Sequence, residues 1–112
     1  MNLDEYQTWT RTTAAYPAAT VLPIPVIYCS LKLAGEAGEV ADKIGKVIRD
    51  QGGVFTGDSK LAVVLELGDV LWYVARLADE LGFTMSQIAG MNQTKLEDRK
   101  IRGKIKGSGD SR

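Results

Sequence analysis

The sequence has no histidine, one cysteine and three prolines, and its 14 acidic residues are balanced by 14 basic ones. Without histidine there is no imidazole to act as a general base, to activate a serine or cysteine nucleophile, or to bind a metal ion. A single cysteine, Cys29, can form neither an intrachain disulfide nor a thiolate zinc cluster. Any catalysis must therefore use carboxylates, lysines, hydroxyls and hard metal ions.

Long apolar runs and an excess of one charge are also absent. The stretch 16–31 is interrupted by Pro17, Pro23 and Pro25, and no run approaches the roughly 20 apolar residues of a membrane span. A net charge of zero provides no overall field to attract nucleic acid or an anionic membrane. We therefore expect a cytoplasmic protein that binds neither.

The apolar residues that are present recur at three- and four-residue spacing, which predicts α-helices. We expect helices over about residues 3–15 and 25–50, a third that Ser59 caps and Gly82 ends, and a fourth after Thr84. Residues 2–5 and 84–87 both match the capping-box pattern. No stretch alternates with period two, so the predicted fold class is all-α, resembling a four-helix bundle.

The length of 112 residues predicts one domain, over residues 1–102. Residues 103–112 are rich in glycine, serine and lysine and are expected to form a flexible tail. A helical body of this size buries little apolar surface, and at least two of its helices have broad apolar faces. We therefore predict a homo-oligomer, either a homodimer or a homotetramer.

Two acidic pairs are the most informative feature. Glu36 and Glu39 lie three residues apart, as do Glu66 and Asp69, and both pairs follow the order acid, any residue, glycine, acid, valine. Residues three apart on a helix project to the same side, so antiparallel packing could bring all four carboxylates to one patch. Their repulsion would then require a cation, and Mg²⁺ is the hard, oxygen-seeking candidate, with Mn²⁺ as a substitute.

The alternative interpretation is a solvated acidic face, which is the usual role of carboxylates at this spacing. The repetition of the pattern argues against this interpretation. The apolar residues around Glu66 and Asp69 also argue against it, because unpaired acids would be unfavourable there. Gly38 and Gly68, inside the two pairs, are expected to let the helix backbones approach closely.

The residues around these pairs resemble a known family. Leu-Ala-Gly-Glu-Ala-Gly-Glu-Val at 33–40 and Leu-Glu-Leu-Gly-Asp-Val-Leu-Trp-Tyr at 65–73 are similar to the paired motifs of MazG-like nucleotide pyrophosphohydrolases. These belong to the all-α NTP pyrophosphatase superfamily, together with dimeric dUTPases and phosphoribosyl-ATP pyrophosphohydrolases. A chain this short resembles the small, often phage-encoded members.

The resemblance implies Mg²⁺-dependent cleavage of a nucleoside triphosphate between its α and β phosphates, giving a monophosphate and pyrophosphate. Glu36, Glu39, Glu66 and Asp69 would bind the metal. One carboxylate would accept the proton of the attacking water, and Glu39 is the first choice.

The family's downstream Asn-x-x-Lys pattern, with a basic residue following it, matches Asn92, Lys95 and Arg99, which would bind the phosphate tail. Tyr73 and Trp72 follow Asp69 and could stack on the base, although aromatic residues at helical spacing more often belong to the core. A solvated basic face is the alternative for the downstream residues.

The substrate stays open at this point. A purine deoxynucleotide such as dGTP is one hypothesis, and a dUTPase-like or phosphoribosyl-ATP-like activity is another. A non-catalytic helical interaction module is the alternative from a different class. The complete set of four acids argues against that module.

Overall fold

Four α-helices and one short 3₁₀ turn make up the protein in this computed structural model, which describes residues 1–112. The elements are α1 (Leu3–Thr10), η1 (Arg11–Thr13), α2 (Ile24–Gln51), α3 (Gly57–Glu80) and α4 (Met85–Ile101). There is no strand, and the predicted all-α class is confirmed. None of the helices combines the length and the apolar character needed to cross a membrane.

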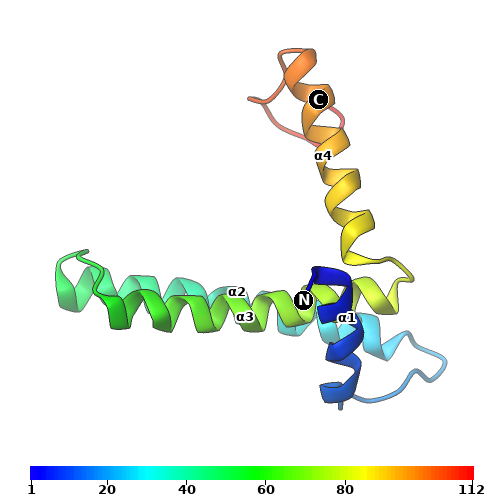
Figure 1. The fold of residues 1–112 in the computed structure, drawn as a ribbon, viewed down its shortest axis with the longest axis horizontal. Helices are drawn as coiled ribbons and strands as arrows, with labels where there is room; N and C mark the ends of the chain where they lie inside the picture. The colour runs from blue at the N-terminus through cyan, green and yellow to red at the C-terminus, as the bar shows by residue number, and fades with distance from the viewer.

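Helices α2 and α3 form a long antiparallel hairpin (Figure 1). The turn between them begins at Gly52 and Gly53, which adopt left-handed backbone angles with φ of 61° and 79°. Only glycine reaches this region without a steric penalty, so the two residues end α2 where the sequence predicts.

The helix ends follow the predicted caps, with two corrections. The capping boxes of Asn2 with Glu5 and of Thr84 with Gln87 are both present. The third helix is capped by Thr56, whose side-chain oxygen accepts a hydrogen bond from the backbone N–H of Ser59. Ser59 lies at the third helical position, and its side-chain oxygen accepts a hydrogen bond from the backbone N–H of Thr56. The first helix ends at Thr10, because the chain tightens there into the 3₁₀ turn.

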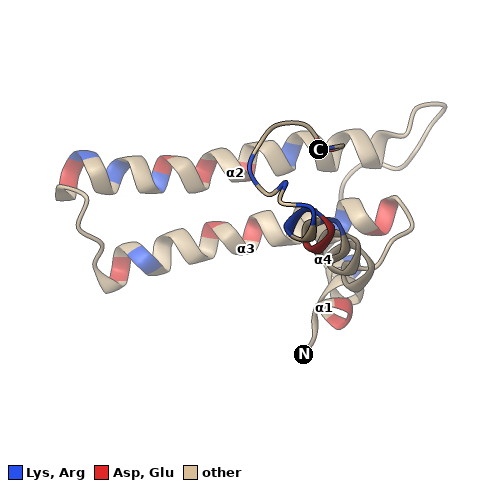
Figure 2. Cartoon of the chain, turned by 90° about the horizontal axis from the view of Figure 1, so that it is seen from above, with Lys and Arg blue, Asp and Glu red and all other residues tan.

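Helix α1 lies across one end of the hairpin, and α4 projects away from that same end (Figures 1 and 2). Met85, in the first turn of α4, is buried with Ala75 and Ala78 of α3. Beyond that turn α4 does not lie alongside α2 and α3, so one copy of the chain does not close a four-helix bundle by itself.

Little of the chain is buried. Only nine of the 112 residues are classed as buried. On the predicted apolar face of the third helix, Ala75 and Ala78 are covered, whereas Leu61, Val64 and Leu65 are each more than half exposed. The face exists as predicted, and most of it is open in the single chain.

Candidate metal centre and adjoining pockets

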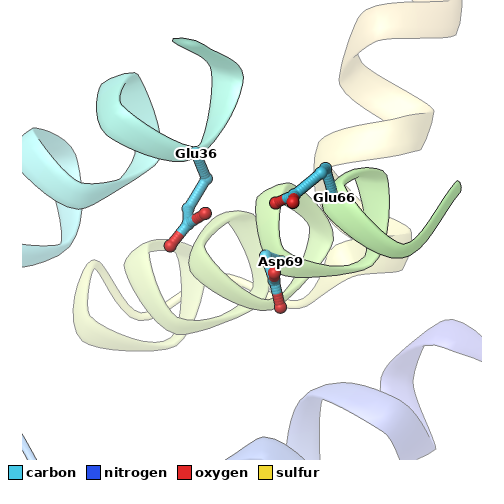
Figure 3. A group of neighbouring side chains, drawn as sticks. All are labelled: Glu36, Glu66 and Asp69. Atoms are coloured by element: carbon cyan, nitrogen blue, oxygen red, sulfur yellow. The ribbon is translucent and has the colours of Figure 1, made fainter. Parts of the chain in front are cut away.

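Three of the four predicted acids converge across the hairpin. Glu36 extends from α2, and Glu66 and Asp69 extend from α3 (Figure 3). Each offers a carboxylate oxygen, and these three oxygens lie within 4.8 Å of one another. Glu36 and Glu66 are half-buried, and Asp69 is exposed. We call these residues the three-carboxylate group.

The donor set of this group fits a hard divalent cation. All three donors are carboxylate oxygens, the ligand type that Mg²⁺ prefers. Oxygens on opposite sides of an octahedral Mg²⁺ lie about 4.2 Å apart, so small side-chain rotations would bring the group to coordination distance. The exposed side at Asp69 leaves room for water or phosphate oxygens to complete the shell.

Glu39 does not join this group. It lies one turn after Glu36 on α2 with its side chain exposed to solvent. The proposed close approach at the two glycines is also wrong, because a Cβ added to Gly38 or Gly68 would meet nothing within 4 Å. The carboxylates meet because Glu36 and Glu66 are long side chains that reach across the hairpin.

A hollow with aromatic walls opens beside the three-carboxylate group. A volume of about 310 Å³ is lined by Thr13, Glu36, Asp69, Trp72 and Tyr73. It adjoins a smaller one of about 190 Å³, whose lining comprises Thr13, Ala15, Tyr16, Tyr28, Trp72 and Tyr73. We call the two together the aromatic hollow. Flat apolar walls next to hard oxygen ligands suit a molecule with a planar ring and a charged tail.

The aromatic rings hold one another in place. Trp72 meets Tyr73 edge-on with 4.8 Å between ring centroids, and the indole N–H of Trp72 donates to Oγ1 of Thr13 at 2.8 Å. Burial, the neighbouring Tyr28 and the charge of Glu36 together raise the pKa of Tyr73 to about 12. Tyr73 therefore stays a neutral hydroxyl at physiological pH.

The segment that closes the aromatic hollow is fixed to α3 by a buried arginine that sequence reasoning missed. Arg76 is 4% exposed and donates to the hydroxyl of Tyr16 at 3.0 and 3.1 Å. It also donates to Asp79 at 2.8 Å. Asp79 in turn accepts two hydrogen bonds from Arg11, at 2.7 and 2.9 Å. The position of Arg76 on the apolar face of α3 could have indicated these contacts, because a buried charge needs hydrogen-bonding partners.

The basic residues of α4 lie away from the acids. Asn92 and Lys95 line a hollow of about 270 Å³ on α4 with Ile88 and Met91. Arg99 is buried by the C-terminal segment, donating to the backbone oxygen of Asp110 at 2.7 Å. Lys95 Nζ lies 3.8 Å from a carboxylate oxygen of Asp110. The three residues predicted to bind phosphate thus lie on α4, but within one chain α4 does not meet the three-carboxylate group.

Comparison with known proteins identifies the family. The family model for the MazG nucleotide pyrophosphohydrolase domain matches residues 29–102, which include both acidic pairs, most of α2 and all of α3 and α4. This chain belongs to the MazG family. The resemblance seen in the sequence is therefore confirmed, and the matched domain runs from Cys29 in α2 through α3 to the end of α4.

One curated relative shows how far the similarity extends. The Gene 37 protein of Mycobacterium phage L5 is 44% identical over 114 residues, and the alignment covers 100% of both chains. The likeness to a small phage protein therefore includes α1 and the C-terminal segment, outside the MazG domain. No solved structure matches the chain.

Proposed function

We propose that this MazG protein is a Mg²⁺-dependent nucleoside triphosphate pyrophosphohydrolase, which converts a triphosphate to a monophosphate and pyrophosphate. The observation that supports it is the three-carboxylate group beside the aromatic hollow, inside the segment that matches the family. Because the similar Gene 37 protein is a phage protein, we propose the cytoplasm of a host cell as the place of action.

In this proposal Glu36, Glu66 and Asp69 bind Mg²⁺, and Mn²⁺ can replace it. When bound, the cation supplies charge neutralisation for the phosphates and the departing pyrophosphate. Tyr73 and Trp72 stack on the base, for which a purine deoxynucleotide such as dGTP is the first candidate to test.

Glu39 is proposed as the general base. The oxygen of a water molecule forms a bond to the α phosphorus, the bond from that phosphorus to the bridging oxygen breaks, and the water's proton passes to a carboxylate. Glu39 is the family-motif acid that lies outside the three-carboxylate group, so its oxygens are free to accept a proton. To serve as a fourth metal ligand instead, the Glu39 side chain would have to rotate toward Glu36.

Asn92, Lys95 and Arg99 are proposed to bind phosphate in a homodimer or homotetramer. Because α4 points away from its own hairpin, its basic face meets a three-carboxylate group only when another copy of the chain provides one. Arg99 would also have to release Asp110 to take part.

The decisive experiment is product identification. The protein is incubated with each ribo- and deoxynucleoside triphosphate and Mg²⁺, and ³¹P NMR distinguishes pyrophosphate from orthophosphate. We expect monophosphate and pyrophosphate, and no turnover after EDTA treatment. The Asp69→Ala protein, purified identically, controls for contaminating enzymes. Orthophosphate as the primary product would contradict the proposal.

A further inference from the structure

One cation contacts the three-carboxylate group, and it is a lysine of α2. Lys43 Nζ lies 3.8 Å from a carboxylate oxygen of Glu66, and no other ion pair reaches Glu36, Glu66 or Asp69. Lys43 follows Glu36 by seven residues, two helical turns, so both side chains project from the same face of α2 toward α3. The Lys43 side chain is 39% exposed, whereas that of Glu66 is 20% exposed, so the ammonium borders solvent.

Lys43 also lines a second hollow, on the side of the acids opposite the aromatic hollow. This volume of about 380 Å³ lies between the end of α2 and the start of α3, and its lining includes Lys46, Gln51, Thr56 and Ser59. Its walls are polar, with the two lysines matched by Asp50 and Asp58. We call it the lysine hollow.

The two hollows and the acids form an ordered series along the hairpin. On α2 the order is Tyr28, Glu36, Lys43, with steps of about 12 and 10 Å along the axis. On the antiparallel α3 the matching order is Trp72, Asp69 and Glu66, then Ser59. Along the groove the lining therefore changes from aromatic to acidic to a mixed polar region that begins at Lys43, and this order matches base, metal-bound phosphate and terminal phosphates in a nucleotide.

The basic residues of α4 cannot replace Lys43 within the chain, because Lys95 and Arg99 both face Asp110. Lys46 also lines the lysine hollow, but its Nζ is paired with Asp42 at 2.8 Å. Lys43 has only the longer contact of 3.8 Å with Glu66. Once a divalent cation neutralises Glu66, the Lys43 ammonium loses that partner and is available to phosphate oxygens.

We propose that Lys43 binds the β and γ phosphates of the substrate, and afterwards the departing pyrophosphate, so that the terminal phosphates point toward the turn between α2 and α3. The inference rests on the proposed function and adds the direction in which the triphosphate lies along the hairpin. Lys43 is a substrate-binding residue, and in the absence of metal it partly neutralises Glu66.

The test measures pyrophosphate binding. Titration calorimetry with excess Mg²⁺ compares the wild type with Lys43→Met, Lys43→Arg and Lys60→Met, using pyrophosphate and a nucleoside monophosphate as the two probes. Lys60 is an exposed lysine of α3 with no ion pair, so Lys60→Met controls for charge and side-chain loss. Mn²⁺ affinity is measured separately by electron paramagnetic resonance.

We expect Lys43→Met to weaken pyrophosphate binding about tenfold or more, as loss of a charged hydrogen bond does. Monophosphate binding should change less than about twofold, since the monophosphate has only the phosphate nearest the base. Mn²⁺ should bind as tightly as in the wild type or more tightly, because a competing cation is gone. Lys43→Arg should retain most of the pyrophosphate affinity, and Lys60→Met should match the wild type.

Unchanged pyrophosphate affinity in Lys43→Met would overturn the inference, and so would equal losses for pyrophosphate and monophosphate. If Lys43→Met does not fold, loss of pyrophosphate affinity in folded Lys43→Arg would overturn it as well. These outcomes leave the proposed function intact when the wild type still releases pyrophosphate from triphosphates. A wild type that binds Mn²⁺ but cleaves no triphosphate would instead contradict the proposed function.

Discussion

At the scale of single residues, the cations around a carboxylate determine its role. Asp79 accepts hydrogen bonds from Arg11 and Arg76, and their positive charges hold its pKa at about 2. Its charge is neutralised inside the chain, and its role is structural. Glu66 pairs with Lys43 at 3.8 Å and neither Glu36 nor Asp69 forms an ion pair, so the three-carboxylate group carries negative charge that the chain does not balance.

The paired charge of Asp79 predicts a pH-dependent contribution to stability. Because the folded pKa is below the ordinary aspartate value of 3.8, the contribution is fully present above about pH 4 and disappears as the pH falls toward 2. Asp79→Asn should lower the free energy of unfolding by about 1–2 kcal/mol at pH 7, allowing for the exposed Arg11. Urea unfolding of both proteins across this range is the measurement.

A difference between Asp79→Asn and the wild type that stays constant from pH 7 to about pH 2 would contradict the assigned ion pairs. Glu97→Gln is the control. Glu97 lies on the exposed surface of α4 and accepts a hydrogen bond from Gln93, so its replacement should be close to neutral at every pH.

Neutralising an acid of the three-carboxylate group should not lower stability as Asp79→Asn does. Glu36→Gln, Glu66→Gln and Asp69→Asn should each lower kcat by orders of magnitude and weaken Mn²⁺ binding. Their melting temperatures without metal should be equal to that of the wild type or higher, because like-charge repulsion is relieved. A variant with near-normal turnover would show that the metal centre lies elsewhere.

Glu39→Gln separates two roles in the same assays. A general base gives a loss of kcat with Mn²⁺ affinity retained, whereas a metal ligand gives a loss of both. Normal kcat would contradict both proposed roles.

Three of the four acids that the sequence predicted converge, and Glu39 shows what sequence spacing does not determine. Residues three apart on a helix differ by about 60° in direction, so both members of a pair share a side without both facing the partner helix. Which member turns inward depends on how α2 and α3 cross, and spacing within one helix does not contain that information. Glu36 faces α3, and Glu39 faces solvent.

At the scale of elements, α4 is attached through its first turn. The first N–H groups of a helix have no partner within it. In α4 the N–H of Met85 donates to Oε1 of Gln7 at 3.1 Å, and that of Ser86 donates to Asp4 at 2.9 Å. The amide of Gln7 also donates to the backbone oxygen of Phe83 at 2.8 Å. One buried glutamine of α1 therefore orients α4 relative to the hairpin.

Gln7→Leu should destabilise the attachment of α4. The substitution leaves the N–H of Met85 and the carbonyl of Phe83 buried without their partner, which costs about 1–3 kcal/mol. Urea unfolding should show this loss, and amide exchange should be faster at Met85. Gln87→Ala, which removes only the exposed half of the capping box, is the control and should cost less. Equal stability of the two variants would contradict the role of Gln7.

The caps of the elements could be predicted because their signals are local, and the direction of α4 could not. A capping box needs residues within one turn, so Asn2–Glu5 and Thr84–Gln87 were recognisable. Thr56 was missed because Ser59, three residues later, is an equally suitable cap by residue type. The bond between Gln7 and Met85 joins residues 78 positions apart, and no local pattern indicates it.

At the scale of the whole molecule, the single chain is more extended than its length requires. Its radius of gyration is 17.1 Å, whereas a compact domain of this size has about 13 Å. The large apolar residues left exposed lie on several helices, and they include Leu31 and Ile48 of α2, Leu61, Val64 and Leu65 of α3, and Met91 and Leu96 of α4. A hairpin with open apolar faces and a projecting helix is the shape of a subunit that packs against copies of itself.

We therefore predict that the protein is a homodimer or homotetramer at micromolar concentration, as measured by light scattering coupled to size exclusion. Leu65→Glu should shift it toward monomer, because a charge is placed on the apolar face of α3, where the side chain is 64% exposed in the single chain. Val21→Glu is the matched control: Val21 is fully exposed but lies in the connection before α2, so its replacement should leave the assembly unchanged.

The Leu65→Glu protein should also lose activity in proportion to its monomer fraction if α4 of another copy supplies Asn92 and Lys95. A wild type that is monomeric, or a monomeric variant with full activity, would show that the hairpin and α1 form the working site alone.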